Sequence, residues 1–306
     1  MKADRSGGPD GVLLLDKPAG ITSTRALAKA KRLLGSLKGG HTGTLDPFAT
    51  GLLPLVFGEA TKFSRFLIDS EKSYMATLRL GEETPTGDTE SAVATRREVD
   101  VSDAAIEAAL RSFLGVQAQI PPMHSAVHVG GRRLYDYARA GEEVERPART
   151  VEILELARLA RRGDDLDVRV RCSKGTYVRT LAQDIGARLG CGAHLVALRR
   201  TAVGGFDLDQ AIGFETLEGD GIPAARLRLL VPEVLVASLA RLDAGPDDAV
   251  RFGHGQEIGA PSGPGAEVAV FGPGGRFLGV ASRVGEGRLA PLRLVSTGGA
   301  KHPDFA

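Results

Sequence analysis

One aspartate in this chain stands in a setting that could direct its carboxylate at a ligand. Asp46 follows the glycine- and threonine-rich stretch 39–45 and directly precedes Pro47. Proline disfavours helical backbone at the residue before it, so Asp46 is expected on extended or turn backbone. The glycines allow tight turns and let another molecule approach the main chain. The loop could present one acid to a ligand, although on the loop alone a surface turn is the commoner arrangement.

Basic side chains gather in one later part of the chain. Between residues 171 and 201 there are six Lys and Arg against one acid, a local excess of five positive charges. The whole chain carries a net charge of only +1, which argues against a general polyanion binder. A local basic stripe on a nearly neutral protein indicates one defined RNA site, and a salt-bridged surface is the alternative.

The elements that must position these residues are a mixture of helices and strands. Apolar residues recur at helical spacing in some segments and alternate in others. Because the two kinds interleave without a regular βαβ repeat, the pattern predicts an α+β fold. The expected elements are a helix at 24–34 ending at Gly35, a helix capped by Ser102 and running to Gly115, a helix at 176–189, and strands at 74–80 and 168–172.

A second, smaller domain is expected at the C-terminal end. The predicted boundary gives a first domain at 1–238 and a second at 239–306. Two apolar runs at 267–271 and 277–281 flank a Gly/Pro turn, which predicts a hairpin, and 289–295 reads as a further strand. Several short strands in so little chain favour a small β-barrel.

A series of motifs resembles one known family in order and spacing. The longest, GGHTGTLDPFATGLL at 39–53, is nearly gapless. Together the motifs resemble the TruB family of bacterial tRNA pseudouridine synthases, the type that modifies uridine 55 in the T loop, over about residues 12–206. The C-terminal part resembles an RNA-binding PUA domain more loosely. The other matching segments are 14–23, 71–74, 119–123, 134–139, 172–181 and 193–201.

The resemblance implies a mixed β-sheet core with flanking helices, a PUA-like barrel, and a catalytic role for three residues. Asp46 would be the indispensable acid, Arg179 its ion-pair partner, and Tyr74 the ring that stacks on the target uracil. His41 would fill the space left by a flipped base, and Leu198 would form an apolar wall against that base. The full set of expected substrate-binding residues is His41, Lys17, Gly40, Thr42, Tyr177, Leu198, Arg139 and Lys174.

The implied reaction breaks the N-glycosidic bond and rejoins C1′ to C5 of the same base. It involves no redox change and no transferred group, so no cofactor is expected. The sequence leaves open whether Asp46 attacks C1′ or deprotonates C2′. A uridine inside a folded arm must be flipped out at a cost of a few kcal/mol. Since the three catalytic candidates precede residue 238, chemistry is expected to survive loss of the second domain.

The expected partner is the T stem-loop of tRNA, without an obligate protein partner. Two other functions remain open: a non-catalytic RNA-binding or tRNA-folding protein, and a guide-RNA-dependent pseudouridine synthase. Residues 119–149 resemble the RNA clamp of the standalone enzyme. Within them, His124 and His128 stand where the family usually has an aromatic residue and a lysine.

No metal site is expected. Residues 125–127 read as a strand, which would hold the rings of His124 and His128 well apart. The two cysteines form no disulfide framework, and neither a secretory signal nor an apolar run long enough to span a bilayer is visible. The expected location is the cytoplasm.

Overall fold

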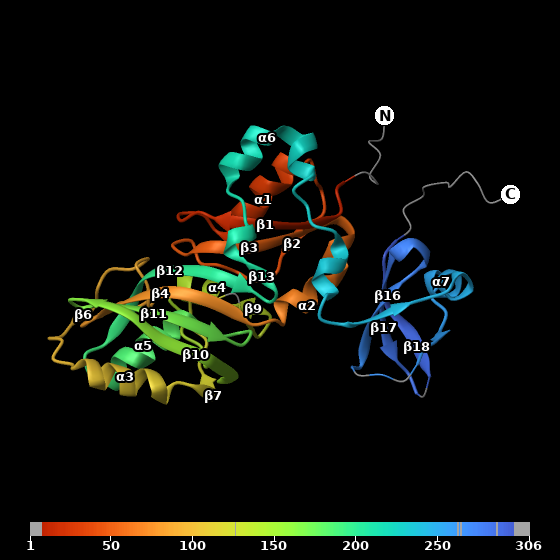
Figure 1. Ribbon diagram of the computed structural model, residues 1–306. Helices are drawn as coiled ribbons and strands as arrows, with labels where there is room; N and C mark the ends of the chain where they lie inside the picture. The colour runs from red at the N-terminus through yellow and green to blue at the C-terminus, as the bar shows by residue number, and fades with distance from the viewer. Residues whose placement is uncertain (1–7, 126, 262, 264, 286, 297–306) are drawn as a thin grey trace.

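Two β-sheets organise the chain in this computed structural model, which describes residues 8–296 except 126, 262, 264 and 286 (Figure 1). The larger, nine-stranded sheet is mixed, because β12 runs parallel to β3 whereas its other neighbouring strands pair antiparallel. In spatial order its main path is β1 (Gly11–Lys17), β3 (Thr50–Phe57), β12 (Ala193–Val203), β4 (Lys72–Leu80), β11 (Asp165–Cys172), β10 (Arg149–Arg162) and β7 (Gly115–Gln119), with β2 (Gly39–His41) on β3 and β13 (Phe206–Asp207) on β12.

The helices begin and end where local signals place them, with two adjustments. The Thr22 side chain caps α1 and Gly35 closes it in the left-handed conformation, at φ 59°. Ser102 caps α3 as expected, but α3 ends at Ser112 because Gly115 already pairs with β10 as the first residue of β7. Helix α5 begins two residues later than expected. The helices are α1 (Ser23–Leu34), α2 (Ser64–Ile68), α3 (Asp103–Ser112), α4 (Leu134–Arg139), α5 (Val178–Leu189), α6 (Phe214–Arg226) and α7 (Pro246–Gly253).

Short elements fill the connections of the described chain. The 3₁₀ helix Pro232–Val236 precedes the second sheet. No helix of the described residues is long and apolar enough to cross a membrane. The remaining short elements are the strand pairs β5 (Glu82–Glu83) with β6 (Thr95–Arg96) and β8 (His128–Val129) with β9 (Arg132–Arg133), and the 3₁₀ helices Gly58–Phe63, Leu208–Gln210 and Pro273–Gly275.

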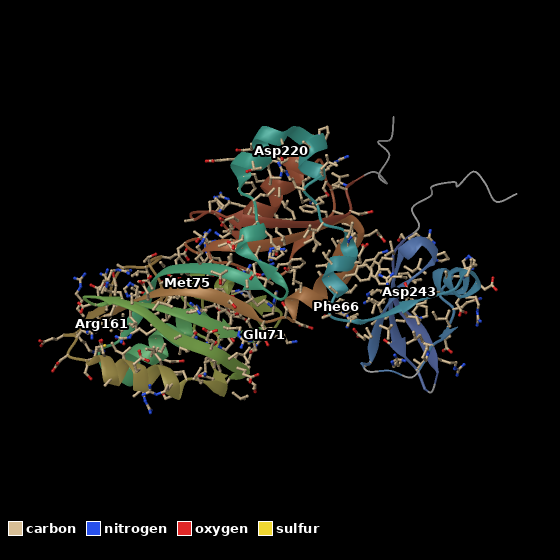
Figure 2. All side chains as sticks on the ribbon, in the orientation of Figure 1. Phe66, Glu71, Met75, Arg161, Asp220 and Asp243 are labelled. Atoms are coloured by element: carbon tan, nitrogen blue, oxygen red, sulfur yellow. The ribbon has the colours of Figure 1, made fainter. Side chains whose placement is uncertain are left out.

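The main core packs the larger sheet against α3 and α5, which cover one of its faces (Figure 1), and it also includes buried residues of α1 and α6. Strand β4 alternates as expected, with Tyr74, Ala76 and Leu78 turned into this core. Met75 points to the opposite face of the same strand, where it is exposed (Figure 2). This alternation confirms the predicted strand, and it places Tyr74 on the side of the sheet from which α5 starts.

The second sheet confirms the expected hairpin. β16 and β17 pair antiparallel around the Gly/Pro turn, and the sheet curls beside α7 in a form consistent with a PUA-like domain (Figure 1). Its first strand begins at Ala240, next to the predicted boundary, which stays a prediction. The order is β14 (Ala240–Asp243), β16 (Glu267–Phe271), β17 (Phe277–Arg283), β18 (Arg288–Leu294) and β15 (Ile258–Gly259).

The two sheets share one apolar cluster. Phe277 of the second sheet packs on Phe63, with ring centroids 5.1 Å apart, and Phe66 also lies between the sheets (Figure 2). The same cluster reaches Val12 of β1 and Leu52 of β3. Strands β1 and β3 border the loop that carries the aspartate, so their packing depends partly on the second sheet.

Candidate active site

The loop carrying Asp46 is fixed at its base by backbone and side-chain hydrogen bonds. Ser23, the first residue of α1, donates through Oγ to Leu45 O at 2.9 Å and accepts from Leu45 N at 2.8 Å. Gly20 N donates to Pro47 O at 2.8 Å. Because both neighbours of Asp46 are held from the start of α1, the carboxylate projects from a rigid support.

Lys17, one of the expected substrate-binding residues, belongs to this support. Its residue is fully buried, and Nζ donates to Pro18 O and Ile21 O, each at 2.9 Å, and to Pro47 O at 3.4 Å. Burial lowers the pKa of Lys17 to about 8, against the opposing effect of the nearby Asp46 carboxylate. The ammonium therefore crosslinks the segments around Asp46.

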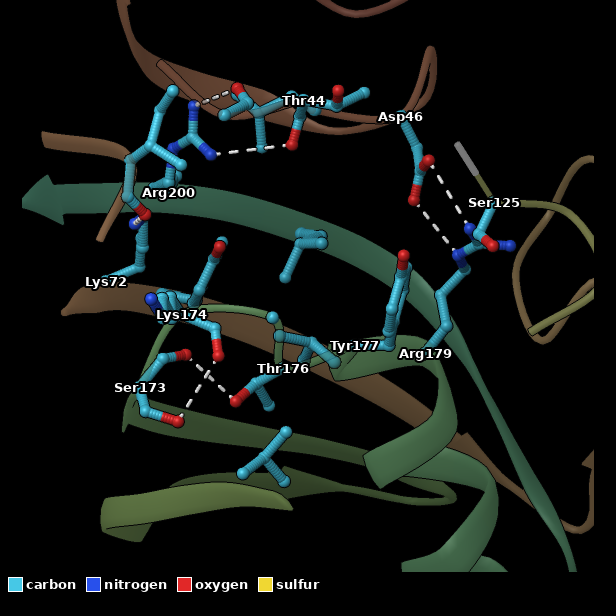
Figure 3. Close-up of a pocket in the computed structure, with 18 of the residues that line it drawn as sticks. Thr44, Asp46, Lys72, Ser125, Ser173, Lys174, Thr176, Tyr177, Arg179 and Arg200 are labelled. Carbon is cyan, nitrogen blue, oxygen red and sulfur yellow. Dashed lines mark hydrogen bonds and ion pairs between the residues drawn. The ribbon is translucent and has the colours of Figure 1, made fainter. Parts of the chain in front are cut away.

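Arg179, the second residue of α5, lies next to Asp46 at one end of the pocket (Figure 3). Its Nε lies 2.9 Å from Asp46 Oδ2, and its Nη2 donates to Oδ1 at 3.4 Å. The arginine side chain is 4% exposed, whereas the aspartate side chain is 30% exposed. The carboxylate is thus held in a guanidinium fork while one side stays open to the cavity.

A second carboxylate, Asp88, lies behind Arg179, and sequence reasoning missed it. Asp88 is fully buried, with Oδ2 3.4 Å from Arg179 Nη1. Arg179 also donates to Thr86 O at 3.0 Å and to His124 O at 2.7 Å. Asp88 follows a turn of ordinary composition, so no local pattern distinguishes it from a surface aspartate. Its effect is to fix the guanidinium from the side opposite Asp46.

The electrostatic environment of Asp46 disfavours its charge. Burial raises the pKa of the Asp46 carboxyl above its ordinary value, while the Arg179 guanidinium opposes this and the Asp88 charge reinforces it. The carboxylate is therefore a stronger base than an exposed aspartate, and Arg179 limits this shift.

The cavity in front of Asp46 has a volume of about 510 Å³ and contains several of the expected residues. Tyr74 and Leu198, from the neighbouring strands β4 and β12, form apolar parts of its wall. Tyr177, directly before α5, and Thr42 also contribute. Burial raises the pKa of the Tyr74 phenol, so this ring stays neutral and suits a flat apolar base.

The opposite end of the cavity is basic (Figure 3). Arg200 is buried and donates to Leu52 O at 2.7 Å and Gly43 O at 3.1 Å. Lys72 is also buried, which lowers its pKa to about 8. Lys174 lies at this end as expected, paired with Asp69 at 2.8 Å. The sequence analysis did not identify Lys72 and Arg200 as cavity residues, because a motif shows which residues are charged but not which of them become buried.

His41 and Gly40 lie in β2, beside the residues that line this cavity. Burial, and secondarily the charge of Arg200, lowers the pKa of His41, so the ring is neutral at pH 7. A neutral imidazole at this place can stack on a base, but the cavity wall itself is formed further along the loop, from Thr42 to Asp46.

The segment expected to clamp RNA carries Arg139 at the end of α4, away from the residues that line the cavity. Its guanidinium lies 5.7 Å from the ring centroid of the exposed Tyr135, which His124 meets edge-on. The expected strand at 125–127 is wrong: residues 125 and 127 are outside any strand, because the pairing begins only at His128.

The basic stripe of the sequence does not form one continuous cationic surface. Arg179 and Arg200 are buried in the site, and Arg199 pairs with Asp16 at 2.7 Å. Arg171 pairs with Glu71 at 2.8 Å. Part of the stretch 171–201 is therefore a salt-bridged surface, which was the alternative to an RNA site, and its two buried arginines belong to the cavity.

Solved structures share this fold. A chain in the crystal structure of a Cbf5-Nop10-Gar1 complex superimposes with a TM-score of 0.72 and 25% identity, covering 97% of this chain and 90% of that one. A chain in an H/ACA RNP bound to a substrate RNA containing 2′-deoxyuridine gives 0.71 and 24%, covering 93% and 84%. These matches confirm the α+β class with its small C-terminal β-domain.

Sequence comparisons are more specific. Residues 31–178 match the TruB family pseudouridylate synthase N-terminal domain, 179–227 the tRNA pseudouridylate synthase B C-terminal domain, and 243–295 the pseudouridine synthase II TruB C-terminal domain. The tRNA pseudouridine synthase B of Aromatoleum aromaticum is 52% identical over 94% of this chain and 93% of its own length. That of an Azoarcus species is 51% identical over 94% and 95%.

Fold and sequence together define a pseudouridine synthase, an isomerase of uridine in tRNA. Within that class the chain belongs to the TruB family.

Proposed function

We propose that this protein converts uridine 55 in the T loop of tRNA to pseudouridine, with Asp46 as the essential group. The observation that carries the proposal is one carboxylate, held by Arg179 and open to a cavity of nucleotide size. The apolar wall of Tyr74 and Leu198 supports a flat base, and the basic end supports the adjoining phosphates.

The reaction requires the target uridine to leave its stack and enter this cavity. Asp46 then acts on the ribose, either by attack on C1′ or by proton removal at C2′, and the C1′–N1 bond breaks. The base turns between Tyr74 and Leu198, and C5 bonds to C1′. In the first route this step breaks the ester bond between Asp46 and C1′, and in the second it returns the proton from Asp46 to C2′. Loss of the C5 proton completes the product, with a proton gained at N1. The raised pKa of Tyr74 argues against a phenolate base and favours a role as platform.

Arg179 keeps Asp46 ionised and fixes its direction in this scheme. Asp88 and the carbonyl oxygens of Thr86 and His124 fix Arg179 in turn. His41 would occupy the space left by the flipped base, and Arg139 would bind the RNA backbone. The proposal includes a cytoplasmic location and no obligate protein partner.

A guide-RNA-dependent synthase that works with partner proteins is the second candidate, because the fold is shared with a chain found in a complex, that of Cbf5, Nop10 and Gar1. Identity favours the standalone enzyme, since relatives at 51–52% carry the name tRNA pseudouridine synthase B. A non-catalytic RNA-binding protein would have no need of Asp46.

The test is turnover on an isolated T-arm hairpin with no guide RNA. We expect the wild-type protein to form pseudouridine at the target position, and Asp46→Asn to bind the hairpin with unchanged affinity but form no product. Product that appears only when guide RNA and partner proteins are added would indicate the second candidate. Turnover by Asp46→Asn would exclude Asp46 as the essential group.

A further inference from the structure

Ser125 is among the residues that line the cavity, and its buried hydroxyl has no hydrogen-bond partner among the described residues. Ser125 is 6% exposed, and Figure 3 shows it beside the pair formed by Asp46 and Arg179. A buried hydroxyl without a partner is destabilising, and most such groups in folded proteins are satisfied. An unsatisfied hydroxyl on a residue that lines a binding cavity therefore points to a partner on the ligand.

The backbone around Ser125 is fixed on several sides. Ser125 N donates to Met123 O at 3.0 Å, and Ser125 O accepts from Tyr135 N at 3.0 Å. The preceding carbonyl, His124 O, accepts from Arg179 Nη2 at 2.7 Å. The segment is thus attached to the catalytic arginine, and rotation about χ1 is the main freedom left to the hydroxyl.

We propose that Ser125 is a substrate-binding residue whose hydroxyl hydrogen-bonds the ribose 2′-hydroxyl of the target uridine. This inference rests on the proposed function, in which Asp46 acts at C1′ or C2′ of that sugar. Ser125 lies at the Asp46 end of the cavity, whereas Lys72 and Lys174 lie at the other end (Figure 3). A serine hydroxyl donates and accepts, which matches a sugar hydroxyl that does the same.

Thr180 offers a matched control. Its Oγ1 is also buried without a hydrogen-bond partner among the described residues, and it is the neighbour of Arg179 on α5. Thr180 is not among the residues that line the cavity. Thr180→Val therefore removes an equivalent hydroxyl where no substrate can reach it. Both Thr180→Val and Ser125→Ala should keep or slightly raise the melting temperature, because each removes an unsatisfied polar group.

The first measurement is kcat/KM on the T-arm hairpin. Ser125→Ala should lose about tenfold or more, whereas Thr180→Val should match the wild type. An unchanged kcat/KM in Ser125→Ala would overturn the inference. Wild-type turnover is measured first: its absence would refute the proposed function, whereas normal wild-type turnover with an unaffected Ser125→Ala refutes only the role of Ser125.

The second measurement is the dissociation constant for two hairpins, one with uridine and one with 2′-deoxyuridine at the target. Ser125→Ala should weaken binding of the uridine hairpin about tenfold. Binding of the 2′-deoxyuridine hairpin should not change, because that RNA lacks the 2′-hydroxyl with which the Ser125 hydroxyl would bond. An equal loss on both hairpins would show that Ser125 acts through the fold and would overturn the inference.

Discussion

Phe277 connects the C-terminal sheet to the strands that support the site, and its replacement by alanine should destabilise both domains. The residue is 7% exposed, and its ring centroid lies 5.1 Å from that of Phe63 and 5.3 Å from that of Phe271. Removing a buried phenylalanine ring costs about 3–5 kcal/mol. Because the same cluster contains Val12 and Leu52, the loss should reach strands β1 and β3.

The positions of the tyrosines allow unfolding of the two domains to be followed separately during denaturation by urea. The chain has no tryptophan, and all four tyrosines, at positions 74, 135, 137 and 177, lie before the second sheet. Tyrosine fluorescence therefore reports unfolding of the first domain, and circular dichroism reports both. In Phe277→Ala both signals should shift together to lower urea, by on the order of 1 M.

Phe252→Ala is the companion variant, because Phe252 is fully buried in a separate cluster inside the C-terminal domain. If the shared core makes one cooperative unit, tyrosine fluorescence should also shift in this variant. Tyrosine signals that stay at the wild-type midpoint in both variants would refute the reasoning. The shared core thus argues against the expectation that chemistry survives loss of the second domain.

Three further predictions concern the site and its RNA. Arg179→Lys keeps a charge but loses the two-nitrogen contact with Asp46, so the single-turnover rate should fall at least tenfold; an equal fall in Arg199→Lys would show that the loss is not specific to the pair with Asp46. Because the pKa of Asp46 is raised, the rate should decline on acidification at a higher pH than for an ordinary aspartate. Asp88→Asn removes a negative neighbour, so it should lower the pH at which half of the rate is lost. A rate independent of pH down to about 4 would contradict this prediction. Arg139→Ala should weaken binding to all T-arm sequences equally and reduce the salt slope by about one unit, so an unchanged slope in titrations at several salt concentrations would exclude a phosphate contact.

Local patterns were sufficient for the elements that obey local rules. The Ser102 cap and the Gly35 terminus follow from side-chain and backbone chemistry within a few residues. Strand β4 follows from its alternation. The end of α3 could not be predicted in this way. Gly115 pairs with β10 as part of β7, and pairing with a strand distant in the sequence outweighs the local preference for a helix.

The sequence by itself determined which residue types meet in the site: an aspartate before a proline in a glycine-rich loop, an arginine at the start of a helix, and a tyrosine on the inner face of a strand. Only the tertiary structure decided their surroundings. Lys17 became an internal crosslink. Asp88 joined the site from a segment with no distinguishing pattern, and Ser125 joined it from the segment expected to clamp RNA. The reason is physical. The sequence specifies that a position carries a carboxylate or a hydroxyl, but the burial and the hydrogen-bond partners of that group depend on chain segments tens of residues away.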